Sequence, residues 1–198
     1  MAATSSIRTF RIILWTLVVV AALGATALFV LRPQAANGPG GGEFKLLDQR
    51  GNAVDQTILV GHPTLLFFGY THCPDVCPTT MAEMQGWFAT LGDEAKTLRA
   101  VFVSIDPARD TPAILGDYVS FVSDRITGLT GPQEEIDKVV KDWNVTAEKV
   151  PGEGDDYTMN HTASVFLVNS RGEFAGTIAW QETTSTALEK IRRLVANT

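Results

Sequence analysis

The first feature of the hydrophobic pattern is an apolar run from Ile12 to Leu31 that contains no charged residue. As a helix this run would be about 30 Å long, which matches the hydrocarbon core of a bilayer. We therefore predict a transmembrane helix over residues 12–31. Because Arg8 and Arg11 precede the run and only Arg32 closely follows it, the positive-inside rule places residues 1–11 in the cytoplasm and the remainder outside.

Two other interpretations of this apolar run compete with a membrane anchor. A cleaved secretory signal has a core of about 7–15 apolar residues followed by a small-x-small site, whereas this run is longer and no convincing site closely follows it. A buried core helix is disfavoured because the run is apolar on all faces and lies beside a Gly-rich segment near the chain terminus. The pattern favours a retained anchor.

The Gly-rich segment separates this run from the rest of the chain. Residues 32–42 include the stretch PQAANGPGGG, which is predicted to be a flexible linker with a typical reach of roughly 18 Å. Residues 43–198 are numerous enough for one domain with a single core, and they contain no internal repeat. The predicted organisation is an anchor, a linker and one domain.

Within the domain, short apolar runs alternate with helical periodicity. Residues 65–68 and 100–105 form continuous apolar runs, as is typical of strands buried on both faces. Apolar residues from Met81 to Leu91 recur at helical spacing, and Gly92 is a plausible stop. Further helices are predicted over residues 111–122, 132–143 and 184–196. In the first of these, Thr111 can cap the helix and Pro112 can occupy its first position.

Two hairpins are predicted at the ends of the domain, one pairing residues 43–47 with 53–57 and the other pairing 163–168 with 173–178. After the leading hairpin the order is strand, helix, strand, helix, helix, strand, strand, helix. This order describes an α/β fold with a mixed sheet covered by helices on both faces. It is the thioredoxin-like plan.

Charge changes this picture in one respect. The chain has 16 basic and 22 acidic residues; three of the basic residues and none of the acidic ones precede residue 43. The domain therefore carries 13 basic against 22 acidic residues, a net charge of about −9. Such a domain would be repelled by nucleic acid phosphates and has no basic stripe to offset this, so we exclude a nucleic-acid-binding function.

The two cysteines, Cys73 and Cys77, lie between a buried strand and the start of a helix. Backbone N–H groups and the dipole at a helix N-terminus favour negative charge, so these thiols are expected to ionise readily. Two cysteines in an exported domain most often form a stabilising disulfide. A bridge across so short a loop constrains the unfolded chain little, however, which favours a metal-binding or redox role.

His161 is far from the cysteines in sequence, but the predicted topology returns it to them. It lies just before strand 163–168, which is expected to run antiparallel to strand 65–68, so the exit of one strand and the entry of the other share an edge. Two thiolates and one imidazole suit Cu(I), although they could also accept zinc or oxidised copper. Zinc usually takes a fourth ligand, which the sequence does not obviously offer. We therefore predict a copper site formed by Cys73, Cys77 and His161. The alternative for His161 is an ordinary surface or core residue, which is the usual role of a lone histidine before a strand.

Other polar residues near these motifs have weaker claims. His72 is a candidate ligand, but a residue adjacent to Cys73 in an extended loop tends to point away from it. His62 is interpreted as part of the loop before the first buried strand. Asp75 and Asp106 could shape the metal-binding loop or act as turn residues. The acidic loop 153–156 is interpreted as solvated or as a docking element.

Three motifs in this order resemble the Sco/SenC family of copper chaperones, over roughly residues 43–198. The resemblance implies a thioredoxin-like fold, copper bound by Cys73, Cys77 and His161, and copper delivery to the CuA-bearing subunit of cytochrome c oxidase during assembly. The short amino-terminal extension resembles that of bacterial members, which implies a single-pass protein of the bacterial inner membrane whose domain faces the periplasm. The motifs are Gly69–Pro78 (GYTHCPDVCP), Val103–Pro112 (VSIDPARDTP) and His161 before an apolar strand.

One position departs from the family pattern. The family commonly has Asp immediately before the histidine, whereas this chain has Asn160. Asn can accept a hydrogen bond but carries no charge, which puts in doubt any role of that carboxylate in orienting the ligand or docking a partner.

The leading hypothesis for function is a copper metallochaperone, which exchanges ligands with its target and is not an enzyme. Its expected partners include another copper carrier or a thioredoxin-like reductant. The alternative is a thiol–disulfide oxidoreductase that keeps the cysteines of a copper-site target reduced. Against this alternative, three residues separate the cysteines where thioredoxins have two, and no proline immediately precedes Ala163. A thiol peroxidase is a third possibility, although nothing marks a peroxide pocket.

Overall fold

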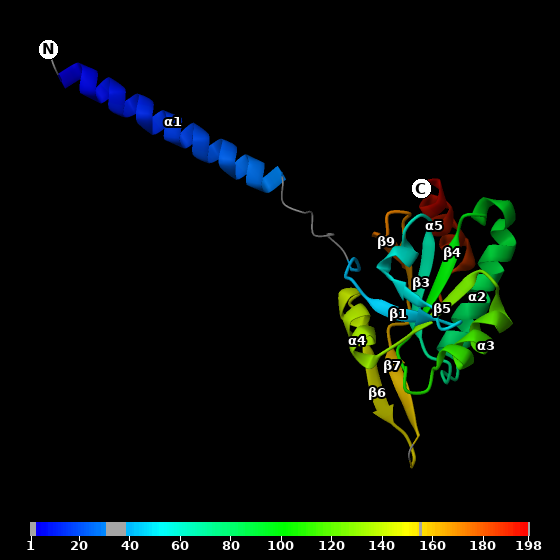
Figure 1. The fold of residues 1–198 in the computed structure, drawn as a ribbon. Helices are drawn as coiled ribbons and strands as arrows, with labels where there is room; N and C mark the ends of the chain where they lie inside the picture. The colour runs from blue at the N-terminus through cyan, green and yellow to red at the C-terminus, as the bar shows by residue number, and fades with distance from the viewer. Residues whose placement is uncertain (1–2, 31–38, 155, 198) are drawn as a thin grey trace. The chain divides into compact units, whose positions relative to one another are not determined.

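The computed structural model describes residues 3–30, 39–154 and 156–197 (Figure 1). The chain divides into two compact units, residues 1–37 and 38–198. The first contains one helix, α1 (Ala3–Val30). In the part of the chain that the structure describes, no helix combines the length and the apolar character that crossing a membrane requires. The predicted transmembrane helix over 12–31 is therefore not confirmed, and residues 31–38, which include most of the predicted linker, lie outside the described residues.

The second unit is built on a seven-stranded mixed sheet with the strand order β2-β1-β5-β4-β3-β8-β9. Strands β3, β4 and β5 are parallel, whereas β8 pairs antiparallel with β3 and β9 with β8. At the other edge, β1 pairs antiparallel with both β2 and β5. The strands are β1 (Lys45–Asp48), β2 (Ala53–Asp55), β3 (Thr64–Gly69), β4 (Arg99–Ser104), β5 (Ile126–Thr130), β8 (Val165–Val168) and β9 (Phe174–Ile178).

The central strand, β3, is buried along its whole length. Its edges are paired by β4 and β8, and its two faces contact different elements. The ring of Phe67 packs against Phe102 on one face, and that of Phe68 packs against Trp143 and Phe166 on the other. The predicted strand with two buried faces is confirmed, because its run of apolar residues has partners on both sides.

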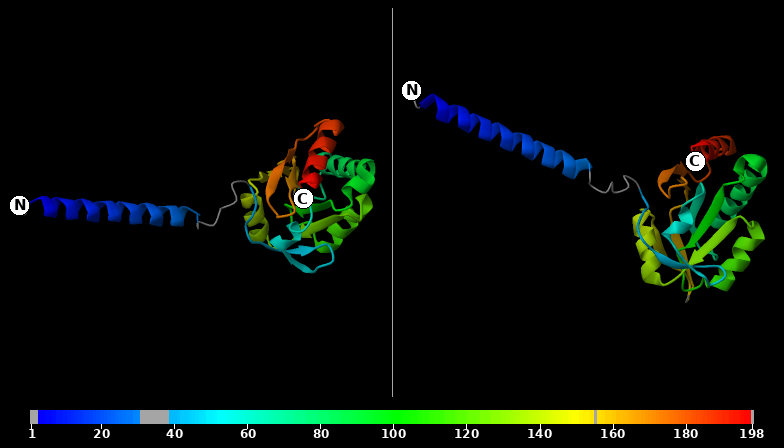
Figure 2. Two further views of the ribbon diagram at one scale, coloured as in Figure 1. Left: turned by 90° about the horizontal axis from the view of Figure 1, so that it is seen from above. Right: turned by 45° about the horizontal axis from the view of Figure 1, so that its top comes forward.

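Helices cover both faces of the sheet (Figures 1 and 2). α2 contacts α3 and α5, and Tyr118 of α3 packs on Phe102, so these three helices share one face. α4 contacts β1 and leads into Trp143 on the opposite face. The helices are α2 (Val76–Leu91), α3 (Pro112–Val122), α4 (Gln133–Asp142) and α5 (Thr184–Ala196), with short 3-10 helices η1 (Gln56–Leu59) and η2 (Gly92–Ala95).

The predicted helix ends are confirmed where a specific residue marks them. The Thr111 side chain accepts a hydrogen bond from the backbone N–H of Ile114, and Pro112 is the first residue of α3. α2 ends at Gly92, whose φ of 49° is a conformation that glycine adopts without strain. Local side-chain chemistry is therefore sufficient to determine these boundaries.

Three strands were missed by the hydrophobic pattern. In β5 the run of apolar residues is interrupted by Gly128, which leaves room for the side chain of Leu115 in α3. β6 (Ala147–Pro151) and β7 (Tyr157–His161) form a separate two-stranded hairpin with mostly polar, exposed residues. Glu153, Gly154 and Asp156 of the acidic loop lie between the two strands, and Asp155 lies outside the described residues. A short strand with few apolar residues leaves little trace in hydropathy.

The end of the predicted linker belongs to the folded unit. The Gly40 N–H donates a hydrogen bond of 2.7 Å to the carbonyl of Asp142. A β-carbon on Gly40 would lie 2.5 Å from the Trp143 ring, so the backbone passes directly over this side chain. Gly40, which the sequence places in the predicted flexible linker, thus contacts the folded unit.

Candidate metal site

Both cysteines lie where β3 leads into α2, as predicted. Cys77 is in the first turn of α2 and is fully buried, whereas Cys73 lies in the preceding loop and is half-buried. The backbone N–H of Cys77 donates to the Cys73 sulfur over 3.4 Å. Both cysteines are free thiols, so both sulfurs can accept a metal ion.

His161 joins the cysteines, as predicted. Its Nε2 atom lies 3.4 Å from the Sγ atom of Cys77, and the three candidate ligand atoms all lie within 4.8 Å of one another. The element that carries His161 differs from the prediction. His161 is the last residue of β7 in the separate hairpin and does not directly precede β8. The antiparallel pairing of β8 with β3 nevertheless brings the chain back to the expected edge.

The orientation of the imidazole is set by its neighbours. Nδ1 lies 3.0 Å from the carbonyl oxygen of Thr162, which can only accept, so Nδ1 donates this hydrogen bond and Nε2 faces the sulfurs. The ring also makes edge contacts with Phe67 and Tyr70, at centroid distances of 6.0 and 5.9 Å. Such an outer hydrogen bond is the usual way in which a ligating histidine is aligned.

The two thiols differ in acidity. The pKa of Cys73 is lowered to about 4, mainly because the Cys77 thiol donates to its sulfur, with help from the backbone N–H groups of Cys77 and Asp75. The pKa of Cys77 is raised, because it shares its proton with Cys73 and because it is buried. Cys73 is therefore a thiolate at neutral pH, and Cys77 would lose its proton on binding a cation.

Asp110 holds the loop that carries Cys73, and sequence reasoning missed this role. Its carboxylate is completely buried and accepts hydrogen bonds from the Thr71 backbone N–H (3.0 Å), the Thr71 hydroxyl (2.6 Å) and the Ser104 hydroxyl (2.6 Å). These bonds join the loop after β3 to the end of β4. In the sequence, Asp110 stands out only as the second aspartate of an Asp-x-x-x-Asp pattern that begins at Asp106. This pattern does not predict which groups either carboxylate contacts.

A second polar cluster holds the hairpin that carries His161. The Tyr157 hydroxyl donates to Asp106 over 2.7 Å, and the Arg109 side chain both pairs with Asp106 and donates to the Tyr157 carbonyl over 3.0 Å. The guanidinium carbon lies 3.6 Å from the centre of the Tyr157 ring. Asp106 therefore shapes the site, as one of its two predicted roles required. It does so by holding the hairpin that carries His161, and not the loop that carries Cys73.

We expect Tyr157→Phe to loosen this hairpin. The change removes the hydrogen bond to Asp106 and keeps the ring, so it should lower the free energy of unfolding by about 1 kcal/mol and Cu(I) affinity by about tenfold. Chemical denaturation and a competition titration measure the two effects. The control is Tyr118→Phe, because the buried Tyr118 hydroxyl has no hydrogen-bond partner among the described residues and its loss should leave copper affinity unchanged. Equal affinities for both variants would contradict the role of Tyr157.

Gly69, the last residue of β3, makes room for the buried sulfur. A β-carbon on Gly69 would lie 2.7 Å from the Cys77 sulfur and 2.9 Å from the Phe102 ring. Gly69→Ala should therefore displace Cys77, lower the free energy of unfolding by about 1–3 kcal/mol, and weaken metal binding. The matched control is Gly86→Ala in α2, where the new carbon has no described atom within 4 Å other than its chain neighbours and its own helix backbone, so helix stability should rise. If the Gly69 variant keeps both its stability and its metal affinity, the proposed steric limit is absent.

The remaining candidates do not join the three ligands. His72 is 52% exposed, and its Nδ1 atom lies 3.1 Å from the Thr71 hydroxyl, so the interpretation that it points away is supported. Asp75 precedes α2 without a side-chain capping bond, and its backbone N–H faces the Cys73 sulfur. His62 lies in the bend before β3.

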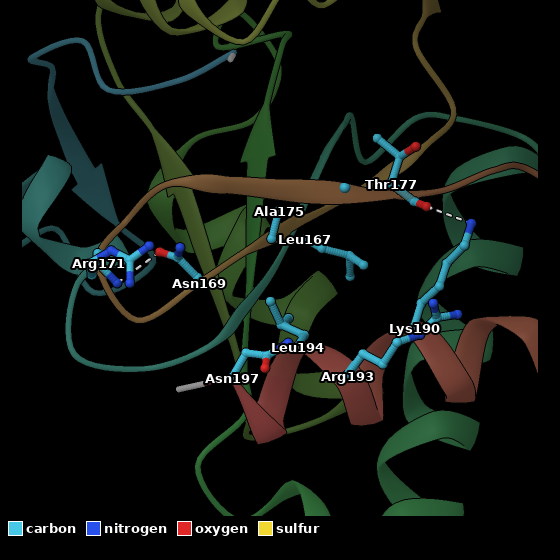
Figure 3. A pocket seen from close by; sticks show the side chains of 10 residues that line it. Leu167, Asn169, Arg171, Ala175, Thr177, Lys190, Arg193, Leu194 and Asn197 are labelled. Carbon is cyan, nitrogen blue, oxygen red and sulfur yellow. Dashed lines mark hydrogen bonds between the residues drawn. The ribbon is translucent and has the colours of Figure 1, made fainter. Parts of the chain in front are cut away.

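An open pocket of about 270 Å³ leads to the site. It is lined by Tyr70, Cys73, Pro74, Asp75, Val76, Thr158, Met159, Asn160 and His161. A larger pocket of about 670 Å³ lies between β9 and α5 and contains none of these residues (Figure 3). Its cations are paired with acids: Lys190 with Glu182, Arg193 with Glu189 and Arg171 with Glu173. The larger pocket thus has no obvious ligand chemistry.

The mixed sheet and the convergent side chains define a thioredoxin-like protein with two sulfur ligands and one imidazole available to a soft metal ion. Residues 32–196 match the SCO1/SenC family. The chain therefore belongs to the SCO1/SenC family.

Similar proteins and structures support this assignment. The chain is 35% identical over 136 residues to the SCO2-like protein of Rickettsia felis, covering 68% of this chain and 66% of that protein. It is 33% identical over 154 residues to the mitochondrial protein SCO1 of Saccharomyces cerevisiae, covering 76% of this chain and 52% of that protein. The matches thus span about half to two thirds of the length of these relatives.

Two solved structures of similar proteins contain copper. Bradyrhizobium japonicum ScoI with copper bound is 44% identical, with a TM-score of 0.72, and the match covers 78% of this chain and 98% of that chain. Yeast Sco1 with copper bound is 32% identical, also with a TM-score of 0.72, and the match covers 80% and 89% of the two chains. The fold is therefore shared with proteins whose structures contain copper, and in this chain Cys73, Cys77 and His161 form a group that could hold a metal ion.

Proposed function

We propose that this protein is a copper metallochaperone that carries Cu(I) on Cys73, Cys77 and His161. The observation that carries the proposal is the convergence of two sulfurs and the free Nε2 of an oriented imidazole within 4.8 Å. Soft sulfur ligands favour Cu(I), and a three-coordinate ion needs no further protein ligand. The half-buried Cys73 and His161 leave one side of the site open for ligand exchange.

An anaerobic titration of the full chain tests the metal site. We expect one Cu(I) per chain, with X-ray absorption showing two sulfur neighbours and one nitrogen neighbour. A variant in which both cysteines are serine should not bind. Preference for zinc over copper in a direct competition, or undiminished Cu(I) binding without the cysteines, would contradict the proposal.

The proposed recipient is the CuA-bearing subunit of cytochrome c oxidase, and the proposed location is the bacterial inner membrane. The resemblance of the three motifs supports the recipient, and the uncharged run 12–31 supports an anchor with the domain in the periplasm. Mixing the copper-loaded chain with the copper-free subunit should move copper to the subunit after separation. Alkaline extraction should leave the full chain in the membrane pellet, whereas its release would contradict the anchor.

A thiol–disulfide oxidoreductase is the second candidate, and the asymmetry of the cysteines favours it. Cys73 is accessible and has a lowered pKa, as an attacking thiol requires, whereas Cys77 is buried and has a raised pKa. Catalytic reduction of a disulfide in the oxidised target, unaffected by His161→Ala, would support this function. No turnover above that of a free dithiol would exclude it.

A further inference from the structure

Met159 lies beside the candidate copper ligands without being one of the three. It is in β7, two residues before His161, and the alternation of a strand places both side chains on the same face. Tyr157, Met159 and His161 are all partly buried, whereas the intervening Thr158 and Asn160 are exposed. The Met159 side chain therefore faces inward.

The exposure of Met159 differs from that of the other methionines whose side chains the structure describes. Met81 and Met84 are 0% and 1% exposed within the core, whereas Met159 is partly exposed and lines the pocket that opens onto the site. Cys73 and His161 line the same pocket. Copper that enters or leaves through this pocket passes between these side chains.

The position of Met159 is tied to that of the histidine. Its backbone N–H faces the hydroxyl of Tyr70, and the Tyr70 ring makes the edge contact with His161. Residues two apart on one strand face are separated by about 6.6 Å, and the three flexible bonds of methionine allow its sulfur to move within that distance. A thioether is a soft, uncharged ligand that suits Cu(I).

We propose that the Met159 thioether is an additional Cu(I) ligand that binds the ion when His161 releases it. This inference rests on the proposed copper-carrier function and describes how the ion leaves the site. The exchange forms a copper–thioether bond as the copper–imidazole bond breaks, and the copper remains Cu(I).

Selenium labelling identifies this ligand directly. The full chain is labelled with selenomethionine and loaded with Cu(I), and copper X-ray absorption is recorded for His161→Ala and for His161→Ala combined with Met159→Leu. We expect a copper–selenium contribution in the first variant that disappears in the second. No selenium neighbour in the first variant would overturn the proposal, and one that persists in the second would assign it to another methionine and overturn it as well.

A kinetic measurement on the unlabelled chain does not depend on the histidine variant. Met159→Leu keeps the volume and apolar character of the side chain, so packing alone predicts no change. We expect a chromogenic Cu(I) chelator to remove copper about tenfold more slowly from Met159→Leu; an unchanged rate would overturn the proposal. Failure of the unaltered chain to bind Cu(I) would instead refute the carrier function itself, so the two failures are distinguishable.

Discussion

Replacing His161 with alanine is expected to lower Cu(I) affinity about a thousandfold, or about 4 kcal/mol, while the domain remains folded. The imidazole supplies one of three ligands, and its Nε2 atom is oriented toward the buried sulfur at 3.4 Å. Because the ring is only half-buried and its main contacts are edges of Phe67 and Tyr70, its loss should leave the sheet intact. Competition titration measures the affinity, and circular dichroism checks the fold.

The matched control for this variant is His72→Ala. His72 is next to Cys73 in sequence, but it is exposed and its ring nitrogen contacts Thr71. We expect its replacement to leave copper affinity unchanged. If the two histidine variants lose affinity equally, or if neither does, the assignment of His161 as the third ligand is wrong.

Asp110→Asn is expected to lower the free energy of unfolding by about 3 kcal/mol, because one buried donor or more would lose its acceptor. An amide has one oxygen and one NH2 group, whereas the carboxylate oxygens accept three bonds from Thr71 and Ser104. The freed loop should also position Cys73 less well and weaken Cu(I) binding. Equilibrium denaturation and copper titration measure the two consequences.

Asp75→Asn provides the control for Asp110, because Asp75 lies in the same loop but is exposed and its side chain accepts a long hydrogen bond of 3.4 Å from the Thr79 hydroxyl. Its effect on stability should be within about 0.5 kcal/mol. A comparable loss in both variants would mean that removing a negative charge, and not the buried hydrogen bonds, causes the destabilisation.

Local patterns were sufficient for the elements that have a distinctive buried face or a specific end. The apolar run of β3, the cap at Thr111 and the stop at Gly92 are decided by residues within a few positions of one another, and each is where the sequence predicts it. The place of the cysteines at the start of α2 follows from the same local signals. Such features do not depend on distant contacts.

The hairpin β6–β7 was not predictable in this way, although it carries His161. Its residues are mostly exposed, and it is attached to the rest of the domain by a polar cluster of Asp106, Arg109 and Tyr157. Asp106 and Tyr157 are 51 positions apart. A hydropathy pattern does not predict which distant charged groups and hydroxyls form contacts. The hairpin and its attachment therefore became visible only in the tertiary structure.

By itself, the sequence determined the thioredoxin-like order of the main elements except β5, the two cysteines at a helix start, and the identity of the distant histidine. The tertiary structure decided that Nε2 faces the sulfurs, that Asp110 holds the cysteine loop, that Gly69 leaves space for Cys77 and that Met159 lines the approach. The physical reason is the distance along the chain over which each interaction acts. Propensity, capping and hydrophobic periodicity depend on residues that are neighbours in the sequence. The alignment of ligand atoms depends instead on buried hydrogen bonds and close packing between segments that only folding brings together.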